Sequence, residues 1–134
     1  MKANELMIGD WVRCTDPKPF RIEQIDGVEE QVYGDDGFFV DTADLQPIPL
    51  KGEMLEKNGF NNRHRRWMWK KKDNYCRIKV SFAPKLEIEG EIFDEPPISL
   101  QVDGATFSLN IIVEYVHELQ HALKLCGIEK EITI

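Results

Sequence analysis

The stretch Cys76-Arg77-Ile78-Lys79-Val80-Ser81-Phe82 alternates apolar and polar side chains with a period of two residues. Because successive side chains of a β-strand point to opposite faces, this period predicts a strand with one apolar and one basic face. Residues 66–70 alternate in the same way, with Trp67 and Trp69 on one side. The two stretches predict neighbouring antiparallel strands that bury the tryptophans.

Further alternating stretches extend the predicted sheet over residues 64–109. A turn at 83–85 would pair the basic strand with the acidic residues 86–91. Asp103-Gly104 is a favoured two-residue hairpin turn, which would place Leu100 opposite Phe107. We expect an antiparallel meander of four or five strands.

Residues 111–126 carry the long helical pattern of this chain. Apolar side chains recur there at every third or fourth position, at Ile112, Val116, Leu119, Leu123 and Cys126. Ser108 or Asn110 can cap this helix, and Gly127 can end it. We expect this helix to cover the sheet, with Leu119 and Leu123 in the core. A short helix at 52–58 and a terminal strand at 130–134 complete the prediction.

Residues 1–46 read as short strands separated by Gly and Asp turns, which is typical of a small SH3-like β barrel. The stretch Gly9-Asp10-Trp11-Val12 is common at the start of such barrels. Pro47-Ile48-Pro49-Leu50 forms a stiff extended connector. The predicted fold class is therefore α+β, with a barrel-like unit at 1–46 and a sheet covered by one C-terminal helix at 47–134.

The composition of the 134 residues, with 42% hydrophobic and 31% charged, is that of a globular chain. The three cysteines lie far apart, which disfavours both a disulfide framework and a zinc knuckle. No apolar run approaches the ~20 residues that span a bilayer, and the residues before Gly9 form no apolar segment, so we expect no signal peptide. We expect a cytoplasmic protein with no membrane partner.

The net charge of −7 is unevenly distributed along the chain. Residues 1–50 hold 4 basic and 11 acidic groups, whereas residues 57–85 hold 10 basic groups against Asp73 alone. The overall charge disfavours nonspecific binding to nucleic acid, but a local basic face can override it.

His117-Glu118-Leu119-Gln120-His121 matches the H-E-x-x-H pattern, in which two His side chains one turn apart grip zinc and Glu polarises a bound water. A catalytic zinc needs a third protein ligand, and Glu114, one turn back, is a candidate. The charged residues around the two histidines are typical of a solvated helix face. We therefore expect no cofactor, with adventitious Zn²⁺ or Ni²⁺ on His117, His121 and Glu114 and a zinc-dependent hydrolase as alternatives.

A basic run with interleaved tryptophans spans residues 63–72. Cations neutralise phosphates and aromatic rings stack on bases, so the run favours contact with single-stranded nucleic acid. The candidate binding residues are Arg63, Arg65, Arg66, Lys70, Lys71 and Lys72. The alternative is an ordinary solvated sheet, in which Glu91 and Glu89 face Arg77 and Lys79 across the strands and neutralise them.

Four segments resemble one family: residues 1–12, 44–50, 55–60 and Tyr115-Val116-His117-Glu118-Leu119-Gln120. They are similar to a family of short uncharacterised proteins of Bacteroides genomes, prophages and mobile elements. In that family the helix reads Tyr-Val-His-x-Leu-Gln-Asn, so His121 stands where the family has Asn. The resemblance implies an accessory role in a mobile element.

These observations favour a non-enzymatic accessory or binding module of a phage or mobile element, with a protein as the expected partner. Nucleic-acid binding through the basic hairpin 63–79 is the first alternative. Zinc-dependent hydrolysis by the helix segment 117–121 is the second.

Overall fold

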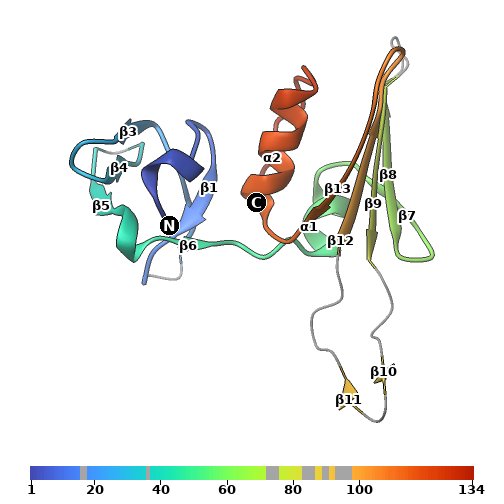
Figure 1. Ribbon diagram of the computed structural model, residues 1–134, viewed down its shortest axis with the longest axis horizontal. Coiled ribbons are helices and arrows are strands. Elements are labelled where there is room, and N and C mark those ends of the chain that lie inside the picture. Colours follow the sequence, from blue (N-terminus) through green and yellow to red (C-terminus); the bar gives the residue numbers. More distant parts are fainter. Residues whose placement is uncertain (16–17, 36, 72–75, 83–86, 89–90, 93–97) are drawn as a thin grey trace. The chain divides into compact units, whose positions relative to one another are not determined.

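The computed structural model describes residues 1–134 with the exception of 16–17, 36, 72–75, 83–86, 89–90 and 93–97 (Figure 1). The chain is α+β, as expected, with antiparallel sheets and two α-helices in the described residues. It divides into two units: the first unit is Met1–Leu50 with Tyr115–Ile132 and Ile134, and the second unit is Lys51–Glu114 with Thr133. The C-terminal helix thus belongs to the first unit, which differs from the division into 1–46 and 47–134 that the connector indicates.

The first unit contains two small antiparallel sheets. One has the order β2-β1-β6, from Phe20–Arg21, Trp11–Arg13 and Gln46–Pro47. The other has the order β3-β4-β5, from Gln24–Asp26, Gln31–Tyr33 and Phe39–Asp41. Two 3₁₀ turns, η1 (Ala3–Glu5) and η2 (Thr42–Asp44), flank these strands. The described strands form no closed barrel.

The core of this unit is built from one apolar side chain of nearly every short segment. Its buried members are Leu6, Val12, Phe20, Ile22, Val32 and Leu45. Strands of two or three residues bury too little surface to be stable alone, so this shared core holds the two sheets together.

The second unit is a five-stranded antiparallel sheet of order β13-β12-β9-β8-β7. Its strands are Ser108–Val113, Ile98–Asp103, Cys76–Phe82, Arg66–Lys71 and Asn61–Arg63. A separate two-stranded ladder joins β10 (Glu87–Ile88) to β11 (Glu91–Ile92). The period-two prediction of strands around 66–71, 76–82 and 98–103 is confirmed.

The apolar face of this sheet is buried, with Ile78, Val80, Leu100 and Val102 fully inaccessible. The ring of Trp67 meets that of Phe82 edge-on, at 4.8 Å between centroids. Helix α1 (Gly52–Lys57) packs against β7 and β8. It passes so close to Trp67 that a Cβ atom on Gly52 would lie 2.4 Å from the indole ring.

The predicted β12–β13 hairpin register is wrong by four residues. Leu100 lies opposite Ile111 and Asp103 opposite Ser108, so residues 104–107 form the loop. The Phe107 ring folds over Gly104, where a Cβ atom would lie 2.2 Å from it, and Phe107 is 41% exposed. The longer loop lets Ile98 pair with Val113, and both side chains are buried.

The predicted helix at 111–126 begins too early. Residues 108–113 form β13, and helix α2 spans Val116–Leu125. The β-branched run Ile111-Ile112-Val113 favours a strand, and its backbone pairs with β12. Gly127 follows the helix with a φ of 70°, and the amide of Ile128 donates to the carbonyl of Leu123, as in a Schellman cap.

The predicted terminal strand at 130–134 is not formed. The backbone of this segment bonds to side chains instead of a strand. The indole N–H of Trp11 donates to the carbonyl of Ile132 (2.7 Å), and the amide of Thr133 donates to the Asn58 side chain (2.8 Å). The C-terminal segment is thus held by side chains and not by a sheet edge.

Candidate functional site

The H-E-x-x-H segment lies in α2, and its glutamate caps the helix. The backbone N–H of Tyr115 donates to the Glu118 carboxylate at 3.0 Å. Tyr115 is the N-cap residue and Glu118 is the third residue of the helix, which is the arrangement of a capping box. Glu118, which would polarise a bound water in a zinc hydrolase, therefore accepts a hydrogen bond that stabilises the start of α2.

His121 binds a buried carboxylate on the turn before β1. Its Nε2 atom lies 2.7 Å from Oδ2 of Asp10, whose side chain is fully buried. The same oxygen accepts the backbone N–H of Met7 at 2.8 Å. Gly9 makes this turn possible, because its φ of 93° is a conformation that other residues rarely adopt.

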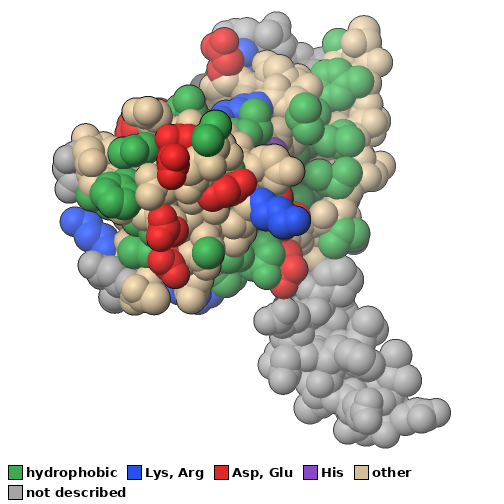
Figure 2. All heavy atoms as spheres, turned by 60° about the vertical axis from the view of Figure 1, so that its left-hand side comes forward, with side chains coloured by type: hydrophobic (Ala, Val, Ile, Leu, Met, Phe, Trp, Pro, Cys, Tyr) green, Lys and Arg blue, Asp and Glu red, His purple; other side chains and the backbone are tan. Residues whose placement is uncertain are grey.

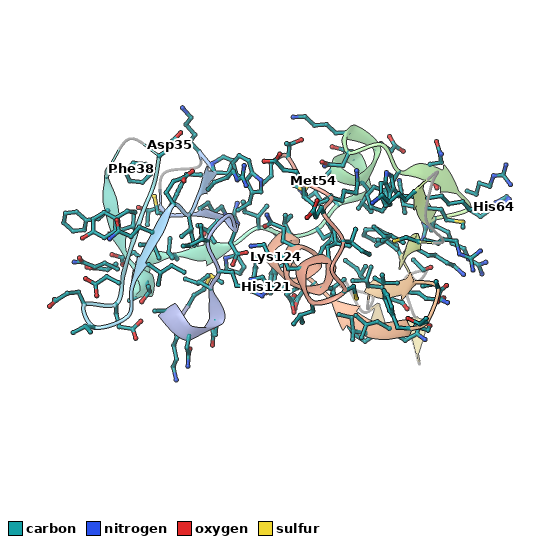
Figure 3. The ribbon with its side chains drawn as sticks, turned by 90° about the horizontal axis from the view of Figure 1, so that it is seen from above. Asp35, Phe38, Met54, His64, His121 and Lys124 are labelled. Carbon is teal, nitrogen blue, oxygen red and sulfur yellow. The ribbon has the colours of Figure 1, made fainter. Side chains whose placement is uncertain are left out.

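Gln120 and Lys124 complete this contact between α2 and the turn. The backbone N–H of Trp11 donates to the Gln120 amide oxygen (3.0 Å), and the Gln120 amide donates to the carbonyl of Gly9 (2.9 Å). The Lys124 ammonium donates to the carbonyl of Ile8 (2.6 Å), and Figure 3 labels His121 and Lys124 on this helix. We call Asp10, Gln120, His121 and Lys124 the docking cluster.

His117 is buried, so the face that carries the two histidines is packed and not solvated. Its side chain is 8% exposed, stacks on Tyr115 and meets the His121 ring edge-on at 5.4 Å between centroids. Its Nδ1 atom has no hydrogen-bond partner among the described residues. Burial lowers the pKa of His117 below 6.5, although the charges of Asp10, Glu118 and Glu5 act in the opposite direction.

The proposed third metal ligand does not share the helical face of the two histidines. Glu114 lies before the first residue of α2, is exposed and belongs to the second unit. Over the described part of the chain, no three His, Cys, Asp or Glu side chains are grouped so as to hold a metal ion. The contacts of Glu118, Gln120 and His121 therefore indicate that the motif positions the helix.

The basic candidates separate onto different parts of the second unit. Arg66 and Lys70 point to one face of β8, and Arg63 joins them because it lies opposite Arg66 on β7. Lys71 points to the other face, opposite Cys76. Arg65 lies at the β7–β8 turn, and Lys72 lies outside the described residues.

Two further cations on β9 share this face, and sequence reasoning assigned them to acidic partners instead. Arg77 lies opposite Lys70 and Asp103, and Lys79 lies opposite Met68 and Gln101. The predicted pairing of these cations with Glu91 and Glu89 is wrong, because β9 pairs with β8 and β12. Glu89 itself lies outside the described residues. We call Arg63, Arg66, Lys70, Arg77 and Lys79 the basic face.

Among the described residues, one of these five cations is paired with an acid. The Arg77 guanidinium lies 3.3 Å from the Asp103 carboxylate. Hydrogen bonds from Ser108 and Gln101, with Arg77, hold the pKa of Asp103 below its usual value. Within the described residues, Arg63, Arg66, Lys70 and Lys79 form no ion pair.

The tryptophans of the basic run do not lie on the basic face. Trp67 and Trp69 alternate with Arg66, Met68 and Lys70 along β8, so they point to the apolar face. Trp67 is buried and Trp69 is half-buried. Among the described residues, no aromatic side chain lies on the same face as these five cations.

Comparison of the chain with protein-family models, with curated proteins and with solved structures found no match. No helix in the described residues is both long and apolar enough to cross a membrane.

The low pKa of His117 predicts a pH dependence of folding. The unfolded chain binds a proton at His117 more readily than the folded chain, so the stabilisation is fully present above pH 6.5. It is lost as the pH falls from 6.5 through the lower pKa of the folded state. Denaturant unfolding between neutral and mildly acidic pH should show this decline, and the decline should flatten in His117→Gln.

His64→Asn provides the matched control, because His64 is an exposed histidine on the β7–β8 turn. This variant should keep the wild-type pH slope. An unchanged slope in His117→Gln would show that burial of His117 is not the cause.

Proposed function

We propose that this chain is a non-enzymatic binding module of a phage or mobile element, and that its basic face holds a nucleic acid. The observation that carries the proposal is the set of like charges that face one another on neighbouring strands. Arg63 lies opposite Arg66, and Lys70 lies opposite Arg77. Like charges directly opposite each other destabilise a sheet, so a fold selected for stability alone would avoid them.

The turn that carries Arg65 adds a second cost to stability. His64 and Arg65 both have positive φ, of 52° and 63°, and they connect the Arg63–Arg66 pair as a two-residue hairpin turn. Such turns favour Asn-Gly, because other residues are strained at positive φ. The chain therefore keeps a cation, Arg65, at a position where glycine would fold better.

The charge distribution also supports a polyanionic partner for the second unit. Residues 57–85 carry 10 basic groups against one acidic group. Acidic side chains are spread over the face of the first unit that Figure 2 presents. Lys and Arg that neutralise phosphates release condensed counterions, so such binding depends steeply on salt.

The accessory role in a phage or mobile element rests on the resemblance of residues 1–12, 44–50, 55–60 and 115–120 to that family. The contacts of Glu118, Gln120 and His121 with the backbone and Asp10 support a non-enzymatic role for α2. A nucleic-acid partner agrees with a cytoplasmic location. We also propose that the two sheets of the first unit form an open SH3-like arrangement, which their shared core supports.

The variant Arg66→Gln/Lys70→Gln/Lys79→Gln tests the basic face. We expect it to bind a short nucleic acid more weakly, with the slope of log K against log salt reduced by about 3. Fluorescence anisotropy over a series of salt concentrations measures both quantities. The far-UV circular dichroism spectrum should stay unchanged.

The matched control is Lys2→Gln/Lys51→Gln/Lys57→Gln, which removes three exposed cations that lie outside the basic face. This control should keep most of the affinity. Equal losses in the two triple variants would mean that net charge, and not the basic face, determines binding.

The variant His64→Asn/Arg65→Gly tests the strained turn. It should raise the free energy of unfolding by about 1 kcal/mol or more, because the favoured turn residues relieve strain at positive φ. The same variant should bind nucleic acid more weakly, since it removes the cation at the turn. Lower stability would show that the turn is not strained, and unchanged affinity would show that Arg65 does not contact the nucleic acid.

A further inference from the structure

We infer that the ligand of the basic face is a double-stranded nucleic acid, held through its phosphate backbone. This inference rests on the proposed function and specifies its substrate class. The basic run and its two tryptophans favour single strands when read in the sequence alone, because aromatic rings give single-strand binders their stacking surfaces. The structure separates the two kinds of side chain onto opposite faces of the sheet.

The basic face offers phosphate contacts without stacking surfaces. The side chains between its cations are polar or aliphatic, such as Met68 opposite Lys79 and Gln101 on the next strand. Trp67 packs against Phe82 beneath the sheet and is 9% exposed. A single strand on this face would therefore gain charge neutralisation but no base stacking.

The dimensions of the basic face fit the charge density of a duplex. Arg66 and Lys70 are four residues apart on β8, so they are separated by about 13 Å, and the three strands β7, β8 and β9 span about 10 Å. A duplex carries one negative charge per about 1.7 Å of its axis, against about 3.4 Å along one strand. The same length of ligand thus brings about twice as many phosphates when it is a duplex.

The rigidity of the sheet favours a duplex further. The cations project from three paired strands, in which Arg66–Lys71 and Cys76–Phe82 share six consecutive pairs. Their backbone positions are fixed before binding. A duplex is also stiff and loses little freedom on this surface, whereas a flexible single strand must be ordered.

The test compares fluorescein-labelled DNA and RNA duplexes with their own isolated strands, using the full chain and anisotropy detection. We expect any duplex that binds to have an affinity several-fold higher than that of either of its strands, and its affinity to fall more steeply with salt concentration. Intrinsic tryptophan fluorescence should not be quenched on binding, because Trp67 and Trp69 face away. Comparing the affinities of the DNA and RNA duplexes identifies which of the two the basic face binds.

Single strands that bind as tightly as the duplex, or that quench tryptophan fluorescence, would overturn this inference while leaving the proposed function in place. The variant Trp69→Phe distinguishes this outcome, since a stacking site would weaken with the loss of the indole. Absence of binding to every duplex and strand, with Arg66→Gln/Lys70→Gln/Lys79→Gln indistinguishable from wild type, would overturn both proposals.

Discussion

The hydrogen bond between His121 and the buried Asp10 is the interaction on which the position of α2 within the first unit depends. It joins residues that are 111 positions apart and attaches α2 to the turn before β1. Gln120 strengthens the attachment by bonding to the backbone on both sides of Asp10. A hydrogen bond to a charged group contributes about 1.5–3 kcal/mol, and a buried carboxylate that loses its partner is costly. These contacts give the polar residues of the helix a structural purpose.

The two candidate sites differ in whether folding explains their residues. The H-E-x-x-H pattern is explained by folding, because Glu118 caps α2 and His121 binds Asp10. The basic face has no such structural account. Four of its five cations lie in like-charged cross-strand pairs, Arg63 with Arg66 and Lys70 with Arg77, and the turn beside them is strained. Features that cost stability and serve no packing contact point to a function outside the fold.

Local sequence patterns predicted the elements in which a single side-chain period is present. The alternation of residues 66–70 and 76–82 predicted the central strands, and the short helix expected at 52–58 is formed as α1. Errors occurred where two local patterns compete. Ile112 and Val116 fit a helical period, but the β-branched run at 111–113 pairs with β12 as a strand.

The candidate sites were less predictable because their partners are distant in sequence. No pattern in the sequence links Asp10 to Gln120, and only the fold brings them to one turn. The sequence signal for this contact was an Asp in a Gly-Asp turn together with a Gln-His pair in a helix. Arg77 and Lys79 are recognisable in the sequence as basic residues. The sequence predicted that the acidic residues that follow them would neutralise them, because no local pattern shows that β9 pairs with β12.

The most direct test of this account is to map the binding surface by NMR chemical-shift changes when a short duplex is added to the isotopically labelled chain. The account predicts that the largest changes fall on the backbone amides of β7, β8 and β9, with small changes at Gly9–Trp11 and along α2. Largest changes on α2, or on the turn that contains Asp10, would contradict it and place the binding site on the histidine-bearing helix.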